Sequence, residues 1–133
     1  MWHRKTVRAY IFDVDKKAFL LGKSSLPPFG FHLPGGGINR KEKPEDAVKR
    51  ELREELNILP ENIINVSYQY SRNTRVLCIP HAEDIFLVIV RNVQIKLSWE
   101  LSESKWIDSE KLRDKNNQDL IDKALNFKYE GKS

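Results

Sequence analysis

The chain has 133 residues, of which 40% are hydrophobic and 32% charged, and its formal net charge at pH 7 is +4. This length is typical of one domain, and this balance excludes a disordered chain. The single cysteine excludes an internal disulfide and a cysteine-based zinc site.

The longest apolar run is strand-sized and far short of a membrane span. The first residues contain no apolar segment followed by a cleavage site of the kind that marks a signal peptide. We therefore expect a cytoplasmic protein, monomeric or homodimeric, with no membrane partner.

The positive charge is concentrated near the N-terminus. Residues 1–35 carry six Lys or Arg and two Asp, whereas acidic and basic residues balance in the rest of the chain, so the whole excess of +4 lies in this segment. It is consistent either with solvated lysines on strand edges or with a basic rim for a phosphorylated ligand. A net charge of +4 is too weak to indicate nucleic-acid binding by itself.

The first third of the chain predicts a hairpin followed by loops. Residues 6–13 alternate and are rich in Val, Tyr, Ile and Phe, which favours a strand, and residues 18–23 favour a second strand after a polar turn. Two prolines and a glycine indicate a loop over residues 24–30, and residues 34–37 predict a tight, glycine-rich bend.

A helix is predicted from Pro44 to about Leu56. Proline is tolerated in the first turn of a helix, and the acids that follow it favour that end. Asn57 can adopt the left-handed conformation that ends helices. Val48, Leu52 and Leu56 form an apolar stripe that should face the core.

The second half predicts strands over residues 63–71, 85–91 and 105–107, a loop over residues 72–82 and a helix over residues 117–127 that packs on the sheet. Cys78 is expected to be a small buried hydrophobe. The order of elements favours an α+β fold with a mixed sheet between helices.

Three acids of the predicted helix share one face, because Glu51, Glu54 and Glu55 stand at positions i, i+3 and i+4. Like charges at this spacing repel, so the helix gains nothing from them without a cation. Glu42 can reach the same region, and Arg50 can neutralise part of the cluster. Such oxygens suit a hard divalent cation, and the glycines before them allow close approach of the backbone to a ligand.

The segment resembles the Nudix box, in which Gly, five residues, Glu and seven residues precede Arg-Glu-aliphatic-any-Glu-Glu-any-Gly-aliphatic. The positions that match are Gly36, Glu42, Arg50, Glu51, Leu52, Glu54, Glu55 and Ile58. Asn57 replaces the family's glycine, a substitution that a left-handed turn tolerates. The resemblance implies one Nudix hydrolase domain over residues 1–133, with an α/β/α sandwich, a mixed β-sheet, a catalytic helix and a C-terminal helix.

The resemblance also implies a role for each matching residue. Nudix proteins use Mg²⁺ or Mn²⁺, for which Glu54 and Glu55 correspond to the principal ligands and Glu51 to a further ligand or the base. Gly35 would contribute a carbonyl oxygen. Glu42 would be an outer ligand or a ligand of a second metal ion, and Arg50 would orient the glutamates rather than contact substrate.

Other candidates lie outside the box. Glu100 stands where some Nudix proteins carry an additional ligand or base, and Glu83 and Asp84 compete for that role. Lys23 and Arg8 are candidate phosphate contacts.

Backbone and aromatic groups complete the predicted substrate site. Gly36 is a candidate for substrate contact through its backbone. Several aromatic side chains could stack on a base, namely Phe29, Phe31, Tyr70 and Trp99. Trp106 is expected in the core, and no chemistry is assigned to His32 or His81.

The expected function is metal-dependent hydrolysis of a nucleoside diphosphate linked to another group, and the expected partner is a small nucleotide. A nucleoside triphosphate is the favoured substrate. ADP-ribose or an RNA 5′ end is the alternative substrate, and a non-catalytic nucleotide-binding module is the alternative from another class.

Overall fold

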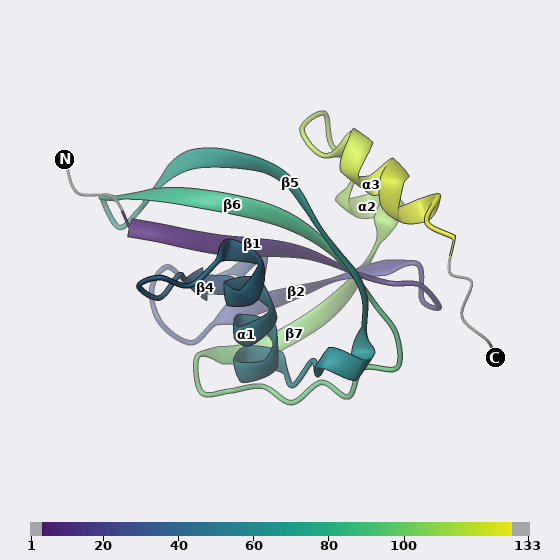
Figure 1. The fold of residues 1–133 in the computed structure, drawn as a ribbon, viewed down its shortest axis with the longest axis horizontal. Coiled ribbons are helices and arrows are strands. Elements are labelled where there is room, and N and C mark those ends of the chain that lie inside the picture. The colour runs from purple at the N-terminus through teal and green to yellow at the C-terminus, as the bar shows by residue number, and fades with distance from the viewer. Residues whose placement is uncertain (1–3, 129–133) are drawn as a thin grey trace.

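The computed structural model describes residues 4–128, which fold as a seven-stranded sheet with helices on both faces (Figure 1). The elements follow in the order β1 (Arg4–Asp13), β2 (Ala18–Ser24), β3 (Phe31–His32), β4 (Gly35–Gly37), α1 (Pro44–Leu56), a 3₁₀ turn (Pro60–Asn62), β5 (Ile63–Val76), β6 (Ile79–Val90), β7 (Leu101–Asp108), α2 (Ser109–Leu112) and α3 (Gln118–Leu125). The expected α+β fold with a mixed sheet is confirmed.

The sheet has the strand order β3-β2-β1-β6-β5, with β4 also paired to β1 and β7 to β2. The β1–β6 pair is parallel and the other pairs are antiparallel. β1 therefore lies at the centre, where it contacts the glycines of β4 on one edge and β6 on the other. This arrangement brings the N-terminal basic segment beside strands that follow much later in the chain.

Side chains of β1 alternate between two hydrophobic layers. Val7, Ala9 and Ile11 pack with the apolar stripe of α1, whereas Tyr10 and Phe12 pack with α3 on the opposite face. The run of apolar residues in β6 follows the same rule, since a strand covered on both faces has no solvent side. The expected α/β/α sandwich is thus confirmed, and Figure 1 shows α1 apart from the α2–α3 pair.

The helix α1 begins and ends where the sequence predicts. Pro44 stands in its first turn, and Asn57 follows its last residue with φ +62°, in the left-handed region. The Asn57 and Ile58 N–H groups donate to the carbonyl oxygens of Arg53 and Leu52, which closes the helix end. The Asn57 amide also donates to the Gln94 carbonyl oxygen over 2.9 Å, an anchor that a glycine would lack.

Two expectations for residues 72–82 are wrong. These residues are not an open loop, because β5 and β6 continue through them as a long antiparallel hairpin down to a pair between Val76 and Ile79. Cys78 lies in the turn of that hairpin, with φ +68°, and is exposed rather than buried. Polar side chains on the outer part of a hairpin hide the alternation on which a strand prediction depends.

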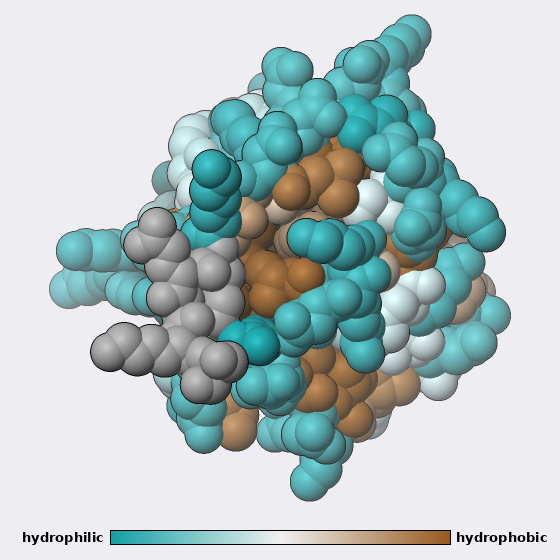
Figure 2. Space-filling model, turned by 90° about the vertical axis from the view of Figure 1, so that its right-hand side faces the viewer, coloured by the Kyte–Doolittle hydropathy of each residue, from teal (hydrophilic) through white to brown (hydrophobic). Residues whose placement is uncertain are grey.

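The other differences are smaller. The predicted strand over residues 105–107 extends to Leu101–Asp108, the predicted C-terminal helix is shorter at Gln118–Leu125, and α2 was not predicted. The face in Figure 2 is mostly hydrophilic, with separate apolar areas between polar side chains. Within residues 4–128 no helix is long and apolar enough to cross a membrane.

Candidate active site

The glycines of β4 lie directly against α1. The Gly35 N–H donates to Glu55 Oε1 over 3.2 Å, and a Cβ added to Gly36 would lie 2.5 Å from the carboxyl carbon of Glu51. At Gly35 an added Cβ would overlap the carbonyl oxygen of Val7, and φ is +155°. Only glycine lets this strand pair with β1 and still touch the carboxylates of the helix.

Arg50 holds the acidic cluster together. Its guanidinium makes two bonds to Glu42, of 2.8 and 2.9 Å, and one of 2.9 Å to Glu51 Oε1. A further bond of 2.9 Å reaches the Gly37 carbonyl oxygen, and Glu54 lies at 3.5 Å. The bonds from Arg50 and from the Asn39 N–H lower the pKa of Glu42 to about 2. This fork-shaped contact supports the orienting role predicted for Arg50.

Glu51 and Glu55, the carboxylates nearest the glycines, have raised pKa values, in contrast to Glu42. Burial, followed by the charges of Glu51 and Glu100, raises the pKa of Glu55 to about 8. Burial also raises the pKa of Glu51, although the bond from Arg50 opposes this. Two buried acids with disfavoured charges are chemically suited to a cation or to proton transfer.

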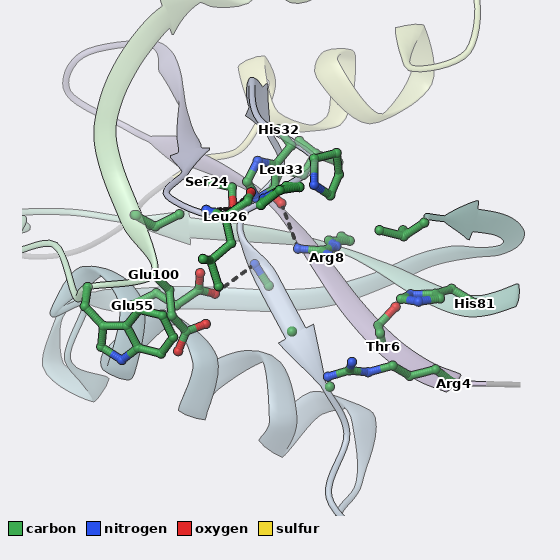
Figure 3. Close-up of a pocket in the computed structure, with 18 of the residues that line it drawn as sticks. Arg4, Thr6, Arg8, Ser24, Leu26, His32, Leu33, Glu55, His81 and Glu100 are labelled. Atoms are coloured by element: carbon green, nitrogen blue, oxygen red, sulfur yellow. Dashed lines mark hydrogen bonds between the residues drawn. The ribbon is translucent and has the colours of Figure 1, made fainter. Parts of the chain in front are cut away.

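The segment before β7 brings Glu100 to this cluster. The Lys96 and Ser98 N–H groups donate to the carbonyl oxygens of Leu56 and Glu55 at the end of α1, over 3.1 and 3.0 Å. The chain is therefore tied to the helix just before Trp99 and Glu100, and Figure 3 shows Glu100 close to Glu55. The side chain of Trp99 is 73% exposed at the rim of the pocket.

A pocket of about 400 Å³ extends from these acids along β1 (Figure 3). Glu55, Glu100 and Gly35 line its acidic end, and Gly36 and Gly37 continue from there toward Arg4. The opposite end is formed by strand residues from β1, β5 and β6. These residues, which we call the arginine end, are Arg4, Thr6, Arg8, Arg72 and His81.

The arginine end is a product of strand register. Thr6, Glu83 and Arg72 face one another across β1, β6 and β5, and Arg4 lies opposite His81. Glu83 is 3% exposed and accepts from Arg8 Nε over 3.2 Å and from Arg72 Nε over 3.0 Å. Burial would raise the pKa of Glu83, but these two arginines outweigh it and lower that pKa.

The predicted site residues divide into two groups. Those that line the pocket are Arg8, Gly35, Gly36, Glu55 and Glu100. Beside it, Glu51 touches Gly36 and Arg50, Glu54 lies near Arg50 with its side chain 54% exposed, and Glu42 lines a neighbouring hollow.

Lys23 and Phe31 lie outside the pocket. Lys23 Nζ is 3.9 Å from Glu103, and the Phe31 ring lies 4.1 Å from Lys105 Nζ. Glu83 and Asp84, the competitors of Glu100, lie in other contacts, since Glu83 binds two arginines and Asp84 accepts from Ser71 over 2.6 Å.

Arg4, Arg72 and His81 line the pocket but were not predicted as site residues from the sequence. Arg72 and His81 fall in the segment that was expected to be a loop, and no local motif joins them to Arg4. The detectable signal is the concentration of basic residues before residue 35, which favoured a basic rim without showing which cations form it.

The acids fit a hard divalent cation by their chemistry, because the carboxylate oxygens of Glu51 and Glu55 lie against the glycines of β4. Within residues 4–128 no three acidic, histidine or cysteine side chains already stand at metal-binding spacing. The acids are therefore candidate metal ligands that do not yet form a closed coordination cage, and Arg50 holds two of them, Glu42 and Glu51, in place.

Comparison with known proteins identifies the family of this chain. A family model described as NUDIX domain matches residues 2–126. RNA pyrophosphohydrolases of Xanthomonas campestris pv. campestris are 30% identical over 97 residues, in matches that cover 59% of this chain and 47% of theirs. The chain thus spans about half the length of these curated relatives.

Two solved structures show the same fold. An Ap4A hydrolase from C. elegans in a binary complex is 25% identical with a TM-score of 0.70, covering 81% of this chain and 82% of that one. A MutT protein from Methanosarcina mazei Go1 is 28% identical with a TM-score of 0.66, covering 82% and 79%. With its fold, its glycine-bound acids and the family match over nearly its whole length, the chain belongs to the NUDIX domain family.

Proposed function

We propose that this protein is a metal-dependent hydrolase that cleaves a phosphoric anhydride of a nucleoside 5′-triphosphate group. The observation that carries the proposal is one pocket with two opposite ends, since Glu55 and Glu100 line one end and three arginines line the other. A polyphosphate needs cations along its oxygens and a base near the phosphorus that is attacked.

Mg²⁺ or Mn²⁺ would be held by Glu51, Glu54, Glu55 and the carbonyl oxygen of Gly35, with Glu42 as an outer partner. When bound, the cation supplies neutralisation of phosphate charge and acidification of the attacking water. Arg50 fixes the positions of Glu42 and Glu51 through bonds of 2.8 and 2.9 Å. It therefore orients the acids and does not contact substrate.

Proton transfer falls to Glu55 or Glu100. Burial raises the pKa of Glu55 to about 8 in the metal-free protein, and a bound cation would favour the charged form, which is the form that can accept a proton. Glu100 faces it from the segment before β7 (Figure 3). Arg8 lines the same pocket, and its positive charge lowers the pKa of Glu55. The same charge would attract phosphate groups that lie between the two residues.

The test is release of phosphate or pyrophosphate from nucleoside triphosphates, oxidised nucleotides, ADP-ribose, dinucleoside polyphosphates and 5′-triphosphorylated RNA, with and without Mg²⁺. Metal-dependent turnover is expected. Glu55→Gln should abolish it, whereas Glu45→Gln is the matched control, because Glu45 lies on the same helix near Lys49 and outside the pocket. Equal loss in both variants, or full activity of Glu55→Gln, would contradict the proposal.

If no compound is hydrolysed, a measurement of thermal stability distinguishes two explanations. Either the true substrate was absent from the set of compounds, or the protein has no metal site. Mg²⁺ should raise the Tm of the wild-type protein by mass action and leave that of Glu55→Gln less affected. Metal binding without turnover of any compound would favour the non-catalytic nucleotide-binding module. No Tm shift and no turnover would remove the metal assignment as well.

An RNA 5′ end is a second candidate substrate. It is supported by the curated relatives, which are named RNA pyrophosphohydrolases. A triphosphorylated RNA end presents the same anhydride as a nucleoside triphosphate and adds a polynucleotide chain beyond the ribose. The question of which substrate is used thus becomes whether this protein has a surface for that chain.

A further inference from the structure

The arginine end of the pocket carries more positive charge than its own carboxylate can balance. Glu83 is shared by Arg8 and Arg72, and Arg4 makes no ion pair with any residue in the described range 4–128. Arg4, Thr6 and Arg8 lie on one face of β1, and the next residue on that face, Tyr10, packs in the hydrophobic cluster that includes α3. The arginine end lies beyond that cover, open to a ligand.

His81, which lines the pocket at the arginine end, contains a buried polar atom that no described residue satisfies. It is 6% exposed, and its Nδ1 has no hydrogen-bond partner among the described residues. A buried ring nitrogen without a partner is uncommon and costs free energy unless another group meets it. Burial and the charge of Arg4 lower the pKa of His81, so the ring is a neutral polar group beside cations.

A second hollow continues from this end of the pocket. It has a volume of about 530 Å³ and shares Arg4 and Gly37 with the pocket. Its remaining cations are Lys5, Arg40 and Lys41, all exposed and without an ion pair inside the described part of the chain. Its one carboxylate belongs to Glu42, and that group is already bound twice by Arg50.

We propose that this second hollow binds the phosphodiester backbone of a single-stranded polynucleotide whose triphosphorylated 5′ end lies in the pocket. The proposal rests on the proposed function for the terminal phosphates and adds the class of substrate. Arg4 lines both hollows and thus joins the arginine end to Lys5, Arg40 and Lys41, and a chain of phosphates is a ligand of matching charge. A mononucleotide would end within the first pocket and leave these three cations unused.

The experiment measures binding and turnover separately. Binding is followed by fluorescence anisotropy of a short, unstructured RNA with a 5′-monophosphate and a 3′ label, which contains no anhydride and is not consumed. Turnover is compared between the 5′-triphosphorylated form of that RNA and a nucleoside triphosphate. Lys5→Gln/Arg40→Gln/Lys41→Gln removes the cations that line only the hollow and leaves Arg4, and none of the three replaced residues has a role in the proposed catalytic machinery.

The control is Lys111→Gln/Lys115→Gln/Lys128→Gln, which makes the same change of charge at exposed positions that line neither hollow. The hollow variant should bind RNA at least about tenfold more weakly, and the slope of log affinity against log salt should be smaller by about 2, since each phosphate contact on a single strand contributes about 0.7. Its KM for RNA should rise, with kcat and nucleoside triphosphate hydrolysis unchanged.

Two further results tell the proposals apart. Equal RNA binding by the two triple variants would overturn the inference even if nucleoside triphosphates are hydrolysed. RNA binding that depends on the hollow, in a protein that hydrolyses nothing, would uphold the polynucleotide surface and refute the proposed function.

Discussion

Replacing Arg50 by alanine tests the central claim about the acidic cluster. The side chain of Arg50 is 20% exposed, and its partner Glu51 is only 11% exposed in its side chain. The substitution leaves a largely buried carboxylate without its cation and leaves the Gly37 carbonyl oxygen without its donor. We therefore expect a clear loss of folding stability in the absence of metal.

The expected size follows from burial. Breaking a fully buried ion pair from one side costs about 3–5 kcal/mol, and exposed pairs contribute about 1 kcal/mol or less. The pair of Arg50 and Glu51 lies between these limits and nearer the buried one, so the free energy of unfolding should fall by about 2–3 kcal/mol at pH 7. Removal of the buried charge as well, in Arg50→Ala/Glu51→Gln, should recover at least about 1 kcal/mol.

The assay is urea unfolding followed by tryptophan fluorescence in the presence of EDTA. Arg113→Ala is the control, because Arg113 makes bonds of similar length, 2.8 and 2.9 Å, to Glu110 and Asp122, whose side chains are 63% and 56% exposed. Arg113→Ala should destabilise the protein far less. Equal losses in Arg50→Ala and Arg113→Ala, with no coupling between Arg50 and Glu51, would refute the reasoning.

Three further predictions depend on single contacts. Gly36→Ala should displace the Glu51 carboxylate, which a Cβ would approach to 2.5 Å, so kcat should fall more than tenfold while the Tm changes little; unchanged kcat would show that this contact is dispensable. The pKa of Glu83 is lower in the folded protein than the ordinary value of 4.5, so its stabilising effect is complete above pH 4.5 and is lost as the pH falls through the folded-state pKa. In urea titrations between neutral and acid pH, Glu83→Gln should weaken this dependence. Leu52→Ala empties a fully buried position and should cost about 2–5 kcal/mol of unfolding free energy, whereas Leu97→Ala, at a side chain 38% exposed, should change the urea midpoint little.

Local sequence was sufficient to predict the helix α1. The helix begins at Pro44 and ends at Asn57 because both signals act through the backbone of a few neighbouring residues. The stripe formed by Val48, Leu52 and Leu56 is fully buried, as its spacing predicted. The clustering of the helix acids likewise needs only the helical period.

Prediction failed where strand pairing decides the structure. The outer part of the β5–β6 hairpin has mixed polar residues, so its ladder depends on the partner strand rather than on its own pattern. The interpretation of Cys78 as buried failed for the same reason, since a turn position is set by the strands that it joins. Pairing also decides that Arg4 lies opposite His81.

The sequence by itself determined the acids, their spacing, the glycines before them and the family they indicate, because each depends on residues close together in the chain. Tertiary structure alone decided that Glu100 meets Glu55 and that Arg4, Arg8, Arg72 and His81 form the opposite end of the pocket. The physical reason is that a helix period is local, whereas the register of β1 against β6 joins residues 77 positions apart.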